Sequence, residues 1–314
     1  MNLIQRSRTE NSAYVQLLIL GGYALAGLLI SSVLGLAIVA VMYGKDVLLN
    51  PAAFITGDPK YLNGLKIIQI MTSIGLFMAP AIALAWTEGK KLDQFYGFKK
   101  PQVLLLLSVF VIMAVSSPIT ELTGLMNQKM TLPGIFKPIE EWMRQKEDET
   151  MRMTIELLTV RSQWDFAVNM FMIALLPAIA EELMFRGGIQ RSFSKMFGNH
   201  HVAIWVTAII FSAIHVQFFG FVPRMLLGAL FGYIYFWTKS LWYTMFAHFL
   251  NNGYAVCLAL YLQKHNMPLD SADNTSNFSW IGYAISILLT IFALYYFKQQ
   301  TSSHGKQLDQ DLHE

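Results

Sequence analysis

The chain has 314 residues, of which 54% are hydrophobic and only 14% are charged, and its formal net charge is +3. Soluble domains carry about 25% charged residues, and their single cores stop growing near about 250–300 residues. The small net charge gives no reason to expect a nucleic-acid partner. The single cysteine, Cys257, excludes an intrachain disulfide framework and a zinc site with several cysteines. The composition predicts a protein that crosses a membrane several times.

Eight apolar runs approach the roughly 17–25 residues that a helix needs to cross a bilayer. They are 14–43, 65–86, 103–115, 166–187, 202–219, 225–237, 241–262 and 280–297. Two are short, because Pro118 cuts off 103–115 and because 225–237 lies between Pro223 and Lys239, so an incomplete span or a re-entrant pair stays open there. We therefore expect an all-α, polytopic membrane bundle of about eight transmembrane helices.

Lysine and arginine between the runs predict the orientation, since short cytoplasmic loops are enriched in both. The basic residues that fall on one side are Arg6, Arg8, Lys90, Lys91, Lys99, Lys100, Arg191, Lys195, Lys239, Lys298 and Lys306. We expect both termini in the cytoplasm, a first apolar run retained as a signal anchor, and a prokaryotic inner membrane. The opposite side receives 45–64, 264–279 and the long polar stretch 120–165.

That polar stretch contains a predicted helix that begins near Lys137 and Pro138 and continues to about Val160. A proline followed by acidic residues is typical of a helix start. The apolar residues of this helix allow it to lie along the membrane surface, and an ordinary exposed hairpin is an equal alternative.

Ionisable groups inside spans are the informative residues, because each costs a few kcal/mol to bury and persists when it is paired or used. The fourth run carries Glu181, Glu182 and Arg186. Glu182 and Arg186 are four residues apart, so they stack on one helix face and can form an ion pair. Glu181 lies on a different face with no cation at helical spacing. Glu181 is therefore predicted to be the free carboxylate, the state that suits a general base.

Two later runs carry His215, four residues after Phe211, and His248, four residues before Asn252. An imidazole and an amide on one helix face can hold a water or donate to a developing oxyanion. Pro177 cannot donate to the Ile173 carbonyl and is expected to kink the fourth span beside Glu181. The depths of these groups allow them to meet in one cavity in the cytoplasmic half. The spacing favours an intramembrane active site or an ion pathway and leaves the two undecided.

Glu181-Glu182-x-x-x-Arg186, Phe211-x-x-x-His215 and His248-x-x-x-Asn252, in this order on successive spans, resemble the signature of the CPBP intramembrane proteases, also called the Abi or CAAX-protease family, which includes the Rce1-like endopeptidases. The resemblance covers about residues 166–254. It implies an eight-helix bundle with a cytoplasm-facing catalytic cavity. We accordingly divide the chain into a cytoplasmic N-terminus (1–13), N-terminal spans with a long extracytoplasmic loop (14–165), a catalytic core (166–262), and a last span with a cytoplasmic tail (263–314).

The resemblance also implies roles for the site residues. Glu181 would activate the attacking water, Glu182 would orient the site through Arg186, His215 would help to hold the water, and His248 and Asn252 would stabilise the oxyanion. No cofactor is expected to be required.

Zinc remains the alternative, since His215, His248 and Glu181 make a two-histidine, one-carboxylate set. Against zinc, the His-Glu-x-x-His helix is absent, and the only His-Glu pair is His313-Glu314. There is no Gly-x-Ser-Gly or Gly-x-Gly-Asp motif of other intramembrane proteases, and Asp58 falls in a Gly-Asp-Pro turn outside the spans.

The sequence therefore favours a membrane endopeptidase that acts on a membrane-associated or lipidated peptide. A proton-coupled transporter that uses Glu181, His215 and His248 as a relay, and a catalytically silent scaffold, are the alternatives. The expected partners are the substrate and the lipid bilayer. The oligomeric state, the substrate and its prenylation are not readable from the residues.

Overall fold

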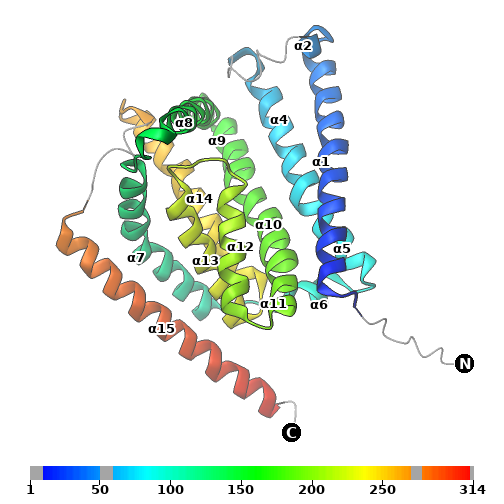
Figure 1. Cartoon of the computed structure of the whole chain (residues 1–314), viewed down its shortest axis with the longest axis vertical. Coiled ribbons are helices and arrows are strands. Elements are labelled where there is room, and N and C mark those ends of the chain that lie inside the picture. The colour runs from blue at the N-terminus through cyan, green and yellow to red at the C-terminus, as the bar shows by residue number, and fades with distance from the viewer. Residues whose placement is uncertain (1–9, 50–58, 270–277, 312–314) are drawn as a thin grey trace, which may run out of the picture.

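The computed structural model describes residues 10–49, 59–269 and 278–311, and this part of the chain is helical without a β-strand. Six helical segments are long and apolar enough to cross a membrane, namely Ala13–Tyr43, Pro59–Thr87, Val103–Gln128, Gln163–Phe197, Leu241–Lys264 and Trp280–Ser302. The predicted all-α, polytopic bundle is confirmed (Figure 1). The number eight stays a prediction, because α12 (His200–Ala213) has only 14 residues and α13 (Phe221–Thr238) is not among the six.

The first two spans form a hairpin at one side of the molecule (Figure 1). In it, α1 (Ala13–Tyr43) runs along α4 (Leu62–Ser73), the π-helical η2 (Ile74–Met78) and α5 (Ala79–Thr87). Gly27 and Gly75 let the two backbones touch, since a Cβ on either residue would overlap the other's carbonyl oxygen. The outward face of α1 leaves large apolar side chains exposed, as lipid contact requires.

The third span does not end before Pro118, contrary to the sequence-based expectation. Helix α7 (Val103–Gln128) continues through this proline. Membrane helices tolerate proline when nearby hydroxyls satisfy the freed carbonyls. Here the Ser116 hydroxyl donates to the Met113 carbonyl and the Ser286 hydroxyl of α15 (Trp280–Asp311) donates to the Val115 carbonyl. The carbonyl that loses its helical donor to Pro118 is that of Ala114, and these two bonds lie on the carbonyls on either side of it.

The fourth span is one continuous rod with five parts. They are α9 (Gln163–Asn169), the π-helical η4 (Met170–Leu175), α10 (Leu176–Glu182), the π-helical η5 (Leu183–Gln190) and α11 (Arg191–Phe197). The helices α12, α13 and α14 (Leu241–Lys264) pack beside it in the middle of the molecule (Figure 1). π-Helical turns occur often at functional sites because they displace side chains from regular helical spacing.

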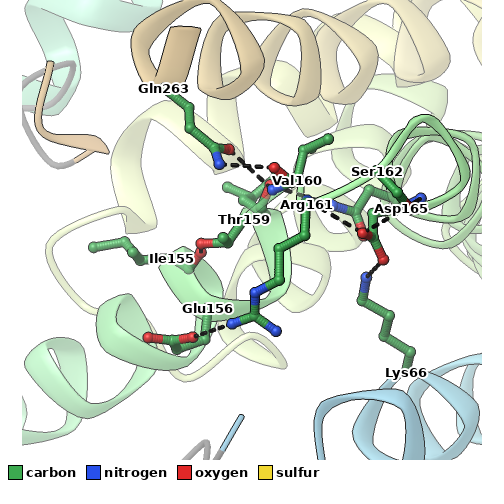
Figure 2. A network of polar contacts seen from close by, with 11 residues as sticks. Lys66, Ile155, Glu156, Thr159, Val160, Arg161, Ser162, Asp165 and Gln263 are labelled. Atoms are coloured by element: carbon green, nitrogen blue, oxygen red, sulfur yellow. Dashed lines mark hydrogen bonds and ion pairs between the residues drawn. The ribbon is translucent and has the colours of Figure 1, made fainter. Parts of the chain in front are cut away.

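The helix predicted near Lys137 is confirmed as α8 (Lys137–Leu158), which lies across one end of the bundle (Figure 1). Its far end is tied down by the polar network of Figure 2. There the Gln263 side chain of α14 exchanges two hydrogen bonds with the backbone of Val160. Asp165 lies 3.8 Å from the buried Lys66 of α4 and accepts a hydrogen bond from Ser162, the N-cap residue of α9. The short helices are α2 (Asp46–Leu49), η1 (Pro59–Tyr61), α6 (Leu92–Tyr96) and η3 (Gly134–Phe136).

The segments predicted to share one side of the membrane do meet at the end of the bundle opposite α8. Glu10 pairs there with Arg191 and Lys195 of α11. The Ser240 hydroxyl before α14 donates to the Lys99 carbonyl. Which end faces the cytoplasm stays a prediction.

Candidate active site

The centre of the site is a fully buried ion pair between Glu182 and Arg186, each 0% exposed. Arg186 Nη1 donates to Glu182 Oε1 at 2.7 Å, and Nη2 donates to the Gly228 carbonyl of α13 at 2.9 Å. The guanidinium also lies 4.8 Å from the ring centre of Phe211 and 5.3 Å from that of Phe231. The pair predicted from the four-residue spacing is therefore confirmed, with Arg186 held from two sides.

His248 of α14 bridges the two glutamates. Its Nδ1 lies 2.9 Å from Glu182 Oε1, and its Nε2 lies 3.9 Å from Glu181 Oε2. The ring stacks on Phe231 with 5.4 Å between ring centres, which fixes its plane. Because an ionised carboxylate only accepts hydrogen bonds, we assign a proton to Nδ1. Nε2 of a neutral ring then faces Glu181 as an acceptor.

Glu181 differs from its neighbour in having its carboxylate unused. The side chain is 12% exposed, and within the described part of the chain no donor forms a hydrogen bond to it. The His248 Nε2 atom lies 3.9 Å from Glu181 Oε2, which is longer than a direct hydrogen bond. A single water can fill such a gap and donate to both acceptors. The geometry thus agrees with the expectation that Glu181 is the free carboxylate.

His215 lies just beyond the end of α12. Its Nδ1 bonds the Phe211 carbonyl at 2.8 Å, which leaves Nε2 available, and its ring meets the Phe211 ring edge to face at 5.2 Å. Val216 follows with φ of 53°, a left-handed backbone that a β-branched residue rarely adopts. Such strained positions cluster at functional sites. Helix α12 ends at Ala213, and this tight turn follows directly after His215.

Asn252 is held by the fourth span. Its Nδ2 donates to the Ile173 carbonyl at 3.0 Å, and its Oδ1 accepts from Asn251 at 3.1 Å. Ile173 is the residue whose carbonyl loses its regular helical donor to Pro177. Asn252 therefore occupies the gap that the proline creates. One Nδ2 hydrogen remains, and the predicted role of Asn252 at an oxyanion stays a prediction.

The zinc alternative with Glu181, His215 and His248 stays a prediction. Among the described residues, no group of three or more His, Cys, Asp or Glu side chains is placed to hold a metal ion. Both His215 and His248 direct Nδ1 at protein acceptors. Two further sequence features, Asp58 and the His313-Glu314 pair, lie outside the described residues.

The sequence analysis missed Arg224, which lies in the first turn of α13. It interacts electrostatically with Glu181 and His215 on one side and with Glu147 of α8 on the other. It escaped notice because the predicted sixth span began one residue later. The rule that ionisable groups inside spans are informative would have found it if the helix had been extended back over Pro223.

The cluster is closed toward α11 and more open toward α8. On the α11 side Tyr96 and Phe231 are at most 1% exposed, and Gln190 is buried too. On the α8 side His215, Gln217 and Arg224 are all partly exposed. The direction of the predicted cytoplasm-facing cavity is not settled by these exposures, and it stays a prediction.

A bundle of membrane-spanning helices with a buried carboxylate, guanidinium and imidazole cluster defines the class as a polytopic, all-α membrane protein. Residues 163–254 match the family described as Type II CAAX prenyl endopeptidase Rce1-like. This part of the chain therefore carries an Rce1-like domain, and the resemblance drawn from the three motifs is confirmed.

A second similarity is to YpbD of Bacillus subtilis (strain 168), which is described as an uncharacterized protein. The two are 28% identical over 116 residues, which is 34% of this chain and 57% of the relative. The chain thus covers little more than half the length of this curated relative. No solved structure matches the chain significantly. The family match supports a CAAX-protease type of intramembrane peptidase.

Proposed function

We propose that this protein is an intramembrane endopeptidase that hydrolyses a peptide bond of a membrane-associated or lipidated substrate with water activated by Glu181. The observation that carries the proposal is the difference between two adjacent carboxylates. Glu182 Oε1 accepts hydrogen bonds from both Arg186 and His248, whereas Glu181 faces His248 Nε2 across 3.9 Å without a hydrogen bond from the described residues. A free carboxylate beside an oriented imidazole is suited to proton transfer.

In the proposed reaction, the water donates one hydrogen bond to Glu181 and one to Nε2 of neutral His248. Glu181 takes the proton as the water oxygen attacks the peptide carbonyl, and the protonated Glu181 then gives it to the leaving amine as the carbon–nitrogen bond breaks. We assign the oxyanion to the unused Nδ2 hydrogen of Asn252. His248 donates to the oxyanion only when both of its ring nitrogens carry protons. His215 Nε2 is assigned to holding the water.

The test compares native membranes that contain the wild type with membranes that contain Glu181→Gln. A general base contributes about 10²–10⁴-fold to the rate, so we expect the cleavage products to disappear while the protein still accumulates. Glu141→Gln, on the exposed surface of α8, is the matched control and should cleave normally. Identical peptide termini in wild-type and Glu181→Gln membranes would contradict the protease. If Glu181→Gln instead removed only a proton-driven flux, the transporter alternative would be correct.

We also propose that no metal takes part. Purified enzyme should then keep its activity after prolonged chelation, and elemental analysis should find no stoichiometric zinc. Activity that falls on chelation and returns with zinc would overturn this mechanism and make Glu181, His215 and His248 ligands.

For the cellular setting, we propose a prokaryotic inner membrane with both termini in the cytoplasm. The basic segments gathered at the end opposite α8 support this orientation.

A further inference from the structure

Two arginines lie at the site, and they differ in how much of their hydrogen-bonding capacity is used. Arg186 is 0% exposed, and both of its terminal nitrogens donate hydrogen bonds, one to Glu182 and one to the Gly228 carbonyl. Arg224 is partly exposed, and its Nη1 is shielded from solvent without a hydrogen-bond partner among the described residues. A shielded N–H group without a partner costs stability unless something binds it. Arg186 Nε is also shielded without a hydrogen-bond partner among the described residues, but Arg186 is fully buried and ion-paired with Glu182. Arg224 is therefore the arginine that an incoming ligand can reach.

The surroundings of Arg224 hold its guanidinium in place without neutralising it. Nη2 donates to the Gln217 side chain, an uncharged acceptor. The guanidinium lies over Gly220, where an added Cβ would come within 3.2 Å of Nη2. No carboxylate of the described residues lies within 4.0 Å of it, although Glu181 and Glu147 both interact with it electrostatically. Glu147 instead accepts a hydrogen bond from the Phe219 backbone.

An anionic ligand at this place would need a cation. Glu181, Glu182 and Glu147 surround the site with negative charge, of which only that of Glu182 is offset by a direct ion pair. An incoming carboxylate would be repelled unless a guanidinium received it. The planar guanidinium is matched to a carboxylate, which it can bind with two parallel N–H bonds.

We propose that Arg224 binds a carboxylate of the peptide substrate on the α8 side of Glu181, and so selects substrates with a negative charge close to the scissile bond. The inference rests on the proposed endopeptidase function and adds a specificity determinant to it. Two sources of the carboxylate share this chemistry, the C-terminus of the peptide chain and an Asp or Glu side chain. The experiment separates them.

The test measures binding rather than turnover, with the full chain in detergent micelles and Glu181→Gln as the common background. The probes are three short acetylated apolar peptides that differ in charge: a free C-terminal acid, its amide, and an amide with one glutamate side chain. We expect at least one of the two acids to bind about tenfold more tightly than the neutral amide, which corresponds to about 1.4 kcal/mol. The acid that shows this preference identifies the source of the carboxylate.

The variants then test whether Arg224 is responsible. Arg224→Gln should abolish the preference for the acid, and Arg224→Lys, which keeps the charge but not the planar fork, should retain part of it. Arg144→Gln is the matched control, since Arg144 stacks on Phe219 nearby but is paired with Glu140. It should leave the preference unchanged. Equal binding of all three peptides, or a preference that survives Arg224→Gln, would overturn the proposal.

The peptide-binding test of Arg224 can be judged separately from the cleavage test of the proposed endopeptidase. If the charged probe is preferred through Arg224 but the wild type cleaves nothing, the endopeptidase proposal fails and the carboxylate site stands. If the wild type cleaves membrane-associated substrates but the three peptides bind equally well, the endopeptidase proposal stands and the carboxylate site fails. If Arg224→Gln does not fold, Arg224→Lys decides, because a preference fully equal to that of the parent would refute a role for the guanidinium geometry.

Discussion

The two sides of the site differ in burial and in whether their charged groups form a direct ion pair. On the side toward α11, Glu182 and Arg186 are fully buried and bonded to each other, to His248 and to the Gly228 backbone. On the side toward α8, the Glu181 carboxylate accepts no hydrogen bond from the described residues, and Arg224 Nη1 has no hydrogen-bond partner among them. The comparison teaches that a charged residue inside a span is structural when it is buried in a direct ion pair, and available for chemistry when it lacks one.

The largest effect should come from breaking the closed side. Glu182→Gln and Arg186→Ala each leave a buried charge without its partner, and we expect a loss of about 3–5 kcal/mol in the free energy of unfolding. Unfolding titrations in mixed micelles would measure it.

Glu181→Gln is the matched control for these variants, because it changes a neighbouring glutamate that carries no buried ion pair. Its unfolding free energy should stay close to that of the wild type. Stable, active Glu182→Gln together with a harmless Arg186→Ala would show that the two sides do not differ as described.

An intermediate loss in the free energy of unfolding is expected from a change at the α8 end of the bundle, which the more open side of the site faces. Asp165→Asn removes the carboxylate near buried Lys66 and weakens the capping hydrogen bonds at Ser162 (Figure 2). Losing a cap and leaving a charge unpaired should cost about 1–2 kcal/mol in the free energy of unfolding.

A double-mutant cycle with Lys66→Met isolates the charge contribution of this pair. In the presence of Lys66→Met, Asp165→Asn should cost less, because no unpaired ammonium remains. Additive losses would show that Lys66 and Asp165 do not interact.

The smallest effect concerns Glu10, at the end opposite α8. Burial opposes ionisation of its carboxyl, but hydrogen bonds and charges from Lys195 and Arg191 prevail and lower the pKa of Glu10 from 4.5 to about 2. Because the folded-state pKa lies below the unfolded value, the stabilisation is present above pH 4.5 and is lost as the pH falls toward 2.

The partly exposed setting of Glu10 limits this contribution to about 1 kcal/mol or less. Glu10→Gln should therefore lower the unfolding midpoint slightly at neutral pH and flatten its decline between pH 4.5 and 2. A wild-type profile identical in slope to that of Glu10→Gln would contradict the ion pair.

Local spacing was sufficient to predict the parts of the site that depend on one helix. The Glu182–Arg186 pair follows from a four-residue separation, and the free state of Glu181 follows from the rotation between adjacent residues. The link between Asn252 and Ile173 could not be predicted, because it joins two spans whose relative register is set by tertiary packing. Only the carbonyl freed by Pro177 could be predicted from the residues.

The fold shows the same division. Apolar runs located the six helices that are long and apolar enough to cross a membrane, but they misplaced several helix ends, including those near Pro118 and Arg224. Pro118 was expected to stop a helix that Ser286 of a distant span supports. Arg224 was left outside α13 because the sixth run was placed after Pro223 and began at residue 225, whereas α13 begins at Phe221.

Phe211 imposes an evolutionary constraint on this site. Its ring contacts Arg186, His215 and His248 at once. Residues that share a neighbour show non-additive effects when they are changed together. Substitutions around Phe211 are thus epistatic. A change tolerated at Arg186, His215 or His248 alters which substitutions the other two positions accept. The three motifs must therefore diversify together rather than one at a time.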